Sequence, residues 1–274
     1  AYQNGTNGWQ TYVDTGVATN AAAAPLSLEL NGDGIVDLLY PVSAGTGLLA
    51  WRILPGTING FGAPFDTGIV SGTSAKVLPG QFAGNGRTQF LVTLNGYWHI
   101  AGYTNAGFSV ASTGLVPSGE YGAADFDGDG LADLLSRVGG FQPTISVRRN
   151  VTVPTQSAAG VQFATAAETI WTVPTGRQSM LWDSLRVADV NGDGRADVIA
   201  LTFVNRVKDT KFFGTALLSN GFGRPVTIGT ETSLWPESMV TMGDWNADGC
   251  SDVLQVPSVF ISNCAGGFVE LNTR

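Results

Sequence analysis

Five short segments of this chain place oxygen-bearing side chains at a spacing that suits a hard metal ion. These nine-residue segments, named loops A to E, cover residues 29–37, 81–89, 125–133, 189–197 and 244–252. In loops A, C, D and E, positions 1, 3, 5 and 9 hold Asp, Glu or Asn, and position 6 is Gly. Alternating oxygen ligands and a glycine that permits a sharp turn are what Ca²⁺ requires. The residue types therefore predict calcium coordination.

Each predicted site combines four side chains with the backbone carbonyl at position 7. The expected ligands are Glu29, Asn31, Asp33, Ile35 and Asp37 in loop A; Asp125, Asp127, Asp129, Leu131 and Asp133 in loop C; Asp189, Asn191, Asp193, Arg195 and Asp197 in loop D; and Asp244, Asn246, Asp248, Cys250 and Asp252 in loop E. The alternative is a set of turns closed by Asx side chains without metal. Clustered carboxylates argue against it, because like charges at this range repel.

Loop B departs from this pattern. Its positions 1, 3, 5 and 9 hold Gln81, Ala83, Asn85 and Gln89, and none of them is a carboxylate. We expect loop B to keep the turn and to bind no ion. The sequence thus predicts about four calcium sites.

The acidity of the chain is mostly predicted metal-site charge. The net charge is −8, and 13 of the 22 acidic residues lie in the loops. Four bound Ca²⁺ ions would add eight positive charges and bring the formal charge to zero, so the acidity says little about partners. The 14 Lys and Arg residues are scattered, which argues against nucleic-acid binding. No apolar run reaches the roughly 18 residues that suggest a membrane span, so membrane insertion is not expected.

The loops begin 52, 44, 64 and 55 residues apart, which indicates a repeat architecture. Apolar residues occupy position 2 (Leu30, Phe82, Phe126, Val190, Trp245) and the pairs at positions 10 and 11 (38–39, 90–91, 134–135, 198–199, 253–254). An EF-hand would continue into a helix with Glu at position 12, which this chain lacks. Short apolar runs follow instead, and turns ending in Gly-Phe or Asn-Gly-Phe close several of them at residues 58–61, 104–108, 219–222 and 262–268. These features favour an all-β fold with three or four strands per repeat.

The loop pattern, with its apolar pair and Asn-Gly-Phe turn, resembles the FG-GAP or VCBS repeat of integrin-α-like β-propellers. This resemblance implies one calcium-loop β-propeller domain over residues 1–274, or a large part of one, with about five to six blades. Residues 2–18 match the second half of a repeat, so we expect the chain to begin within a blade or to come from a larger propeller. Residues 187–198 and 219–222 are also similar to bacterial propellers beside RHS repeats, such as the B component of insecticidal toxin complexes.

Cys250 and Cys264 are the two cysteines of the chain. Cys250 lies at position 7 of loop E and Cys264 in the following turn, so a disulfide would close a small loop and stabilise the fold by about 3 kcal/mol in the entropy model. The alternative is two free thiols. A disulfide fits the exported protein that calcium sites of the extracellular class suggest.

The sequence gives little support for catalysis, since His99 is its one histidine and no nucleophile motif accompanies it. Trp51 and Trp98 occupy equivalent strand positions and are expected in the core. Trp171, Trp182 and Trp235 lie in the predicted connections between blades, where they would stack on a sugar or a partner, or pack between blades.

The sequence therefore predicts a non-catalytic, calcium-stabilised propeller from a secreted or cell-surface, bacterial protein. Its expected role is that of a scaffold or recognition module for a protein partner. A carbohydrate-binding lectin is the main alternative, because the same repeat builds sugar-binding propellers. An enzyme acting on polysaccharides would need convergent acids and a base, for which the sequence offers weak candidates.

Overall fold

The protein is all-β, as the sequence predicts. The computed structural model describes residues 3–4, 8–9, 23–140, 142–154, 158–176, 178–179, 185–205, 210–219, 226–228, 240–255 and 258–272. Within these ranges the regular elements are strands, apart from short 3-10 turns such as η1 (Ala158–Gly160). No helix in this part of the chain has the length and hydropathy needed to cross a membrane.

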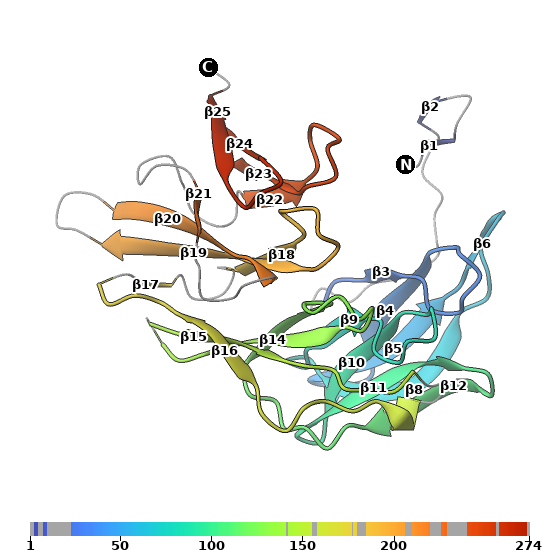
Figure 1. Ribbon diagram of the computed structural model, residues 1–274. Helices are drawn as coiled ribbons and strands as arrows, with labels where there is room; N and C mark the ends of the chain where they lie inside the picture. The colour runs from blue at the N-terminus through green and yellow to red at the C-terminus, as the bar shows by residue number, and fades with distance from the viewer. Residues whose placement is uncertain are drawn as a thin grey trace. The chain divides into compact units, whose positions relative to one another are not determined.

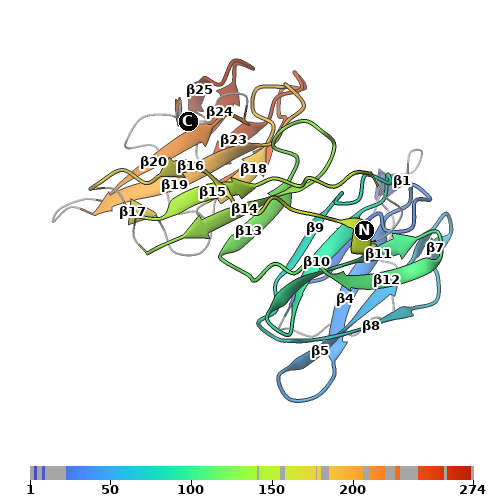
Figure 2. The ribbon, with the colours of Figure 1, turned by 60° about the horizontal axis from the view of Figure 1, so that its bottom comes forward.

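Five antiparallel sheets, named A to E after their loops, follow one another along the chain (Figures 1 and 2). Sheet A contains β3 (Leu26–Leu28), β4 (Asp37–Ser43), β5 (Leu48–Leu54) and β8 (Phe65–Gly72), and sheet B contains β9 (Val77–Gly80), β10 (Gln89–Leu94), β11 (Tyr97–Thr104) and β12 (Gly107–Ser112). Sheet C contains β13 (Glu120–Ala124), β14 (Asp133–Val138), β15 (Thr144–Arg148) and β16 (Glu168–Thr172).

Sheet D contains β18 (Leu185–Ala188), β19 (Asp197–Asn205), β20 (Thr210–Leu217) and β21 (Val226–Ile228), with β17 (Gln178–Ser179) also paired to β19. Sheet E contains β22 (Val240–Gly243), β23 (Asp252–Gln255), β24 (Ser258–Ser262) and β25 (Phe268–Asn272). Two short ribbons, β1–β2 (Gln3–Asn4, Gly8–Trp9) and β6–β7 (Gly56–Thr57, Gly60–Phe61), stand outside the five sheets.

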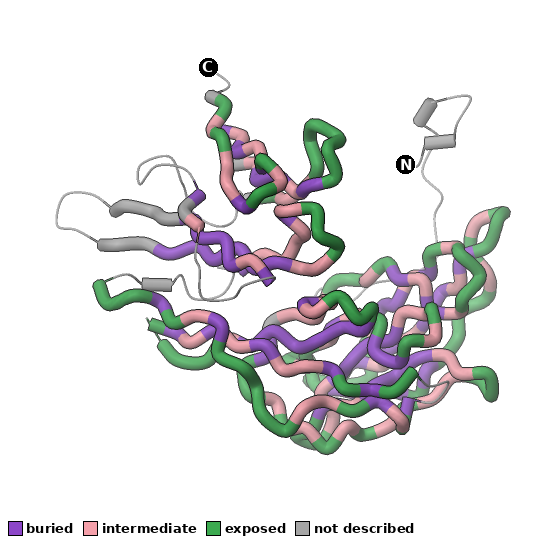
Figure 3. The backbone as a smooth tube through the Cα atoms, in the orientation of Figure 1, coloured by how far each residue is buried: buried purple, intermediate pink, exposed green. Residues whose placement is uncertain are grey.

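Each loop joins the first strand of its sheet to the second, and position 9 is the first residue of that second strand. Consecutive residues of a strand point to opposite faces, so the apolar pair at positions 10 and 11 supplies both faces. In sheet C, for example, Leu134 and Leu135 are both fully buried, and Figure 3 shows burial along the inner strands. The second strands of sheets B, C and D are thus covered on both faces, whereas Leu38 in sheet A and Leu254 in sheet E are only partly buried.

The Gly-Phe turns form hairpins where the structure describes them. Thr104 pairs with Gly107 at the end of β11, and Ser262 pairs with Phe268 at the end of β24. The turn at 58–61 joins β6 to β7. The turn predicted at 219–222 lies largely outside the described residues.

The chain divides into two compact units, Ala1–Pro117 with Val153–Val161 and Ser118–Thr152 with Gln162–Arg274. The first unit holds sheets A and B, whose shared core includes Leu30, Trp51 and Phe90. Trp51 and Trp98 are both buried, as expected. The second unit holds sheets C, D and E, with one core between C and D and another between D and E. The single domain, the closed propeller and the blade number stay predictions.

Candidate metal-binding loops

In the acidic loops, the position-9 carboxylate is buried and hydrogen-bonds two separate backbone segments. Asp37, Asp133, Asp197 and Asp252 are at most 1% exposed. One carboxylate oxygen accepts the N–H of position 2, at 2.8–3.1 Å. The other oxygen accepts, at 2.7–2.8 Å, the N–H of a residue at the end of β5, β15, β20 or β24 or just after it. These second donors are Gly56, Asn150, Ser219 and Ser262. Since a carboxylate offers about four lone-pair sites, lone pairs remain for an ion.

The other acidic side chains are gathered by the N–H groups of their own loop. In loop D, Asp189 accepts the N–H of Gly192 at 2.7 Å and that of Gly194 at 2.9 Å. Asp193 accepts the N–H of Arg195 at 2.9 Å. In loop A, Glu29 accepts the N–H of Gly32 at 2.6 Å, so its longer side chain reaches the donor that Asp uses elsewhere. In loop C, ligand oxygens of Asp125, Asp127 and Asp133 lie within 4.8 Å of one another.

Burial, with a smaller effect of neighbouring charges, raises the pKa of some of these carboxyls. Burial raises the pKa of Asp133 to about 6; the N–H of Asn150 acts against this rise, and the charge of Asp127 adds to it. Burial also raises the pKa of Asp197 and of Asp129. A cation at the centre of such a loop would favour the charged form of these groups.

Loop B fills the same space with a side-chain amide. Gln89 Oε1 accepts the N–H groups of Phe82 and Ala83, at 2.8 and 3.0 Å. Its Nε2 donates to Asn85 Oδ1 at 2.8 Å and to the Arg87 carbonyl at 2.6 Å. Backbone N–H groups only donate and a carbonyl only accepts, so these partners fix the orientation of the amide.

The two acceptors of Gln89 Nε2 are the oxygens at positions 5 and 7, which are predicted to bind Ca²⁺ in the other loops. An N–H donor therefore stands where the other loops would place a cation. This explains physically why loop B can keep the turn without carboxylates.

Loop B is accordingly expected to gain an ion when the ligands are restored. Replacing Gln81, Asn85 and Gln89 together by Asp removes the amide and supplies three carboxylates. Native mass spectrometry should then detect one more Ca²⁺ than in the original protein. Gln89→Glu alone serves as the control with one carboxylate. An unchanged ion count in the triple variant would contradict the assignment.

Neighbouring loops of a unit are bonded to each other. The N–H at position 8 donates to the position-1 carbonyl of the preceding loop: Thr88 to Glu29 at 2.9 Å, Ala196 to Asp125 at 2.7 Å, and Ser251 to Asp189 at 2.7 Å. These bonds connect loop A to B, C to D and D to E. The loops are thus contacts between consecutive sheets as well as turns within them.

The same pairs of loops meet a second time, at the glycine of position 4. A Cβ on Gly32, Gly128 or Gly192 would lie 2.8–2.9 Å from the position-7 side chain of the next loop, which is Arg87, Arg195 or Cys250. All three glycines have positive φ, between 71° and 86°. Both the backbone conformation and the close approach therefore favour glycine. Loop E has Ala247 at position 4, also with positive φ, at 60°.

Cys250 and Cys264 form a disulfide, with their Cα atoms 5.6 Å apart. It ties loop E to the turn between β24 and β25. Cys250 is 1% exposed, and its Sγ faces Gly192 of loop D.

We expect this disulfide in protein from an oxidising compartment. Intact mass after alkylation without reduction should show no added label, and reduction before alkylation should add two. Two labelled thiols in unreduced protein would contradict the bond.

Of the three tryptophans predicted to bind a ligand, the structure describes only Trp171. Trp171 lies in β16, is partly buried and packs against the core between sheets C and D, which fits the packing alternative. Trp182 and Trp235 lie outside the described residues. Trp245, at position 2 of loop E, is 51% exposed, whereas the other four loops bury their position-2 side chains completely. Its size is the one sequence signal that sets it apart.

Two solved structures share the fold of this chain. A Tc holotoxin pore of Photorhabdus luminescens matches with a TM-score of 0.54 and 20% identity, covering 96% of this chain and 12% of that one. A lectin of Agrocybe aegerita, described as recognising non-reducing terminal N-acetylglucosamine, matches with a TM-score of 0.57 and 17% identity, covering 90% of this chain and 64% of that one. No family model and no curated protein matches the sequence. This chain therefore spans about an eighth of the toxin chain.

Proposed function

We propose that this chain is a non-catalytic, calcium-stabilised β-propeller of the FG-GAP or VCBS type. It serves as a scaffold or recognition module in an exported, toxin-associated bacterial protein. The observation that carries the proposal is the double role of the loops. The residues that would coordinate the ion belong to the same nine-residue segments that bond one sheet to the next.

The donor set fits Ca²⁺. Loops A, D and E each offer three carboxylates, one Asn and a carbonyl, and loop C offers four carboxylates and a carbonyl. Hard oxygen ligands of this number and charge are those that Ca²⁺ prefers. The amide of Gln89, in the cation position of loop B, supports the same assignment from a loop that lacks the charge.

Calcium would act on stability through the sheet contacts. Position 1 contributes its carboxylate to the predicted site and its carbonyl to the next loop, as Asp125 and Asp189 do. Position 7 contributes its carbonyl to the site and its side chain to the glycine of the preceding loop. An ion that fixes both positions therefore orders the contact between neighbouring sheets. Ligands supplied mainly by the protein leave few open positions for a substrate, which supports a structural role over a catalytic one.

Amide hydrogen exchange tests this role at the bonds concerned. Exchange of the Ala196 and Ser251 amides, which donate to Asp125 and Asp189, should slow when Ca²⁺ is added. The amide of Leu91, in the middle of β10, serves as a control in the sheet whose own loop is not acidic. Equal protection of Ala196 and Ser251 with and without Ca²⁺ would count against the proposal.

Carbohydrate binding is the second candidate, because one of the two proteins of similar fold is a lectin. A glycan array that includes terminal N-acetylglucosamine separates the two functions. The scaffold proposal predicts no specific glycan signal. Specific binding that is lost in Trp182→Ala or Trp235→Ala, with calcium binding unchanged, would establish the lectin instead.

A further inference from the structure

Loop C differs from the other acidic loops at position 3. In loops A, D and E this residue is Asn, and its Nδ2 donates to the position-5 carboxylate at 3.0, 3.1 and 2.8 Å. Loop C has Asp127 there, and an ionised carboxylate has no hydrogen to donate. Loop C therefore carries one more carboxylate and lacks the amide donor of the other acidic loops.

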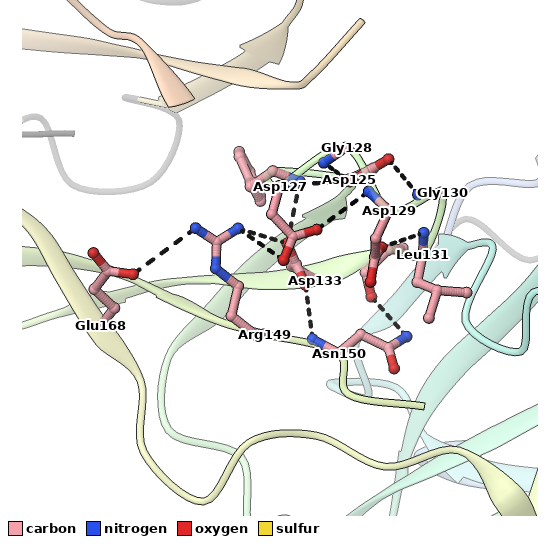
Figure 4. A network of polar contacts seen from close by, with 12 residues as sticks. Asp125, Asp127, Gly128, Asp129, Gly130, Leu131, Asp133, Arg149, Asn150 and Glu168 are labelled. Atoms are coloured by element: carbon pink, nitrogen blue, oxygen red, sulfur yellow. Dashed lines mark hydrogen bonds and ion pairs between the residues drawn. The ribbon is translucent and has the colours of Figure 1, made fainter. Parts of the chain in front are cut away.

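Arg149 compensates for this difference. Its Nη1 lies 3.1 Å from Asp133 Oδ2 and 3.6 Å from Asp127 Oδ2, and its Nη2 lies 3.8 Å from Glu168 Oε2. Figure 4 shows the guanidinium between the loop on one side and Glu168 of β16 on the other. The side chain of Arg149 is 25% exposed, so the pairing with the buried Asp133 is partly shielded from water.

A cation at this position is specific to loop C. Arg149 directly precedes Asn150, whose N–H bonds to Asp133. The residues that precede the equivalent donors in loops A, D and E are Pro55, Leu218 and Ile261, which carry no charge. The four ligand carboxylates of loop C and Arg149 sum to −3, which equals the charge of the three ligand carboxylates in each other acidic loop. The position-7 arginines add a further cation beside loop A (Arg87) and beside loop C (Arg195).

The guanidinium and an ion would share the same oxygens, since Asp127 and Asp133 are both expected ligands of loop C. We propose that Arg149 is a built-in competitor of Ca²⁺ that sets the affinity of loop C. Ion binding there displaces the guanidinium from Asp127 and Asp133 and leaves it paired with Glu168. Loop C, which has the most carboxylates, therefore binds Ca²⁺ more weakly than its four carboxylates alone would. This inference rests on the proposed calcium binding.

Calcium titration of the whole chain, followed by NMR, tests the competition loop by loop. The amide signals of Gly128 and Gly130 report loop C, and those of Gly192 and Gly194 report loop D in the same sample. Arg149→Gln should tighten binding to loop C by at least roughly fivefold, because removing a charge at this range changes the interaction by more than about 1 kcal/mol. The loop D signals should titrate as in the original protein.

The double variant Asp127→Asn with Arg149→Gln reproduces the ligand set of the other acidic loops and should bring the affinity of loop C close to that of loop D. Unchanged or weaker binding of loop C in Arg149→Gln, with loop D still titrating, would overturn the competition and leave the proposed function standing. The absence of any calcium response in both loops of the original protein would overturn both.

Discussion

Removal of Ca²⁺ by a chelator is expected to lower the melting temperature of this protein by at least about 5 °C. An ion that binds the folded state alone stabilises it by about 2.7 kcal/mol at a concentration of one hundred times its Kd, and 1 kcal/mol corresponds to roughly 2–4 °C in a chain of this size. The second compact unit contains loops C, D and E, whereas the first contains one acidic loop, A. The larger shift should therefore come from the second unit.

Calorimetry with and without chelator measures this effect. Magnesium at the same concentration is the ionic control, because its small size and octahedral geometry suit these loops poorly. Asp129→Ala, which removes an exposed predicted ligand of loop C, should reduce the shift without abolishing it. A melting temperature that does not change on chelation would contradict calcium stabilisation.

Replacement of Asp197 by Ala should destabilise the protein by roughly 2–6 kcal/mol even without calcium. The Asp197 carboxylate accepts the N–H groups of Val190 and Ser219, at 3.0 and 2.7 Å, and it is fully buried. Each buried donor left without a partner costs about 1–3 kcal/mol. Chemical denaturation in the presence of chelator measures the loss.

Asp193→Ala is the matched control in the same loop. Asp193 is an exposed predicted ligand, so its replacement should change the calcium-free stability by no more than about 0.5 kcal/mol. It should nevertheless weaken calcium binding to loop D. Equal effects of the two substitutions in chelator would show that Asp197 has no separate connecting role.

The local features of the fold could be predicted from the sequence because their causes lie within a few residues. The oxygen spacing, the glycine at position 6 and the apolar pair after position 9 together indicate a loop that opens a buried strand. The structure places Asp37, Gln89 and Asp133 at the first residue of such strands.

The contacts of the loops could not be predicted, because they depend on strand register and on neighbouring sheets. Arg149 reaches Asp133 because β15 pairs with β14 and ends beside the loop. The position-4 glycines meet side chains that come from the next repeat, as Gly128 meets Arg195. Gln89 occupies position 9, where the other loops have Asp, so its place in the sequence does not show which way its amide points. The hydrogen-bond partners of the amide show it.

The number of bound ions tests the account most directly. Native mass spectrometry of the whole chain, exchanged into calcium and then into chelator, counts them. The predicted result is four bound Ca²⁺ ions. One ion is lost in a variant of each of loops A, C, D and E, and none is lost when Gln89 is replaced by Ala. A protein that carries no Ca²⁺ at millimolar concentration, or a fifth ion that depends on loop B, would contradict it.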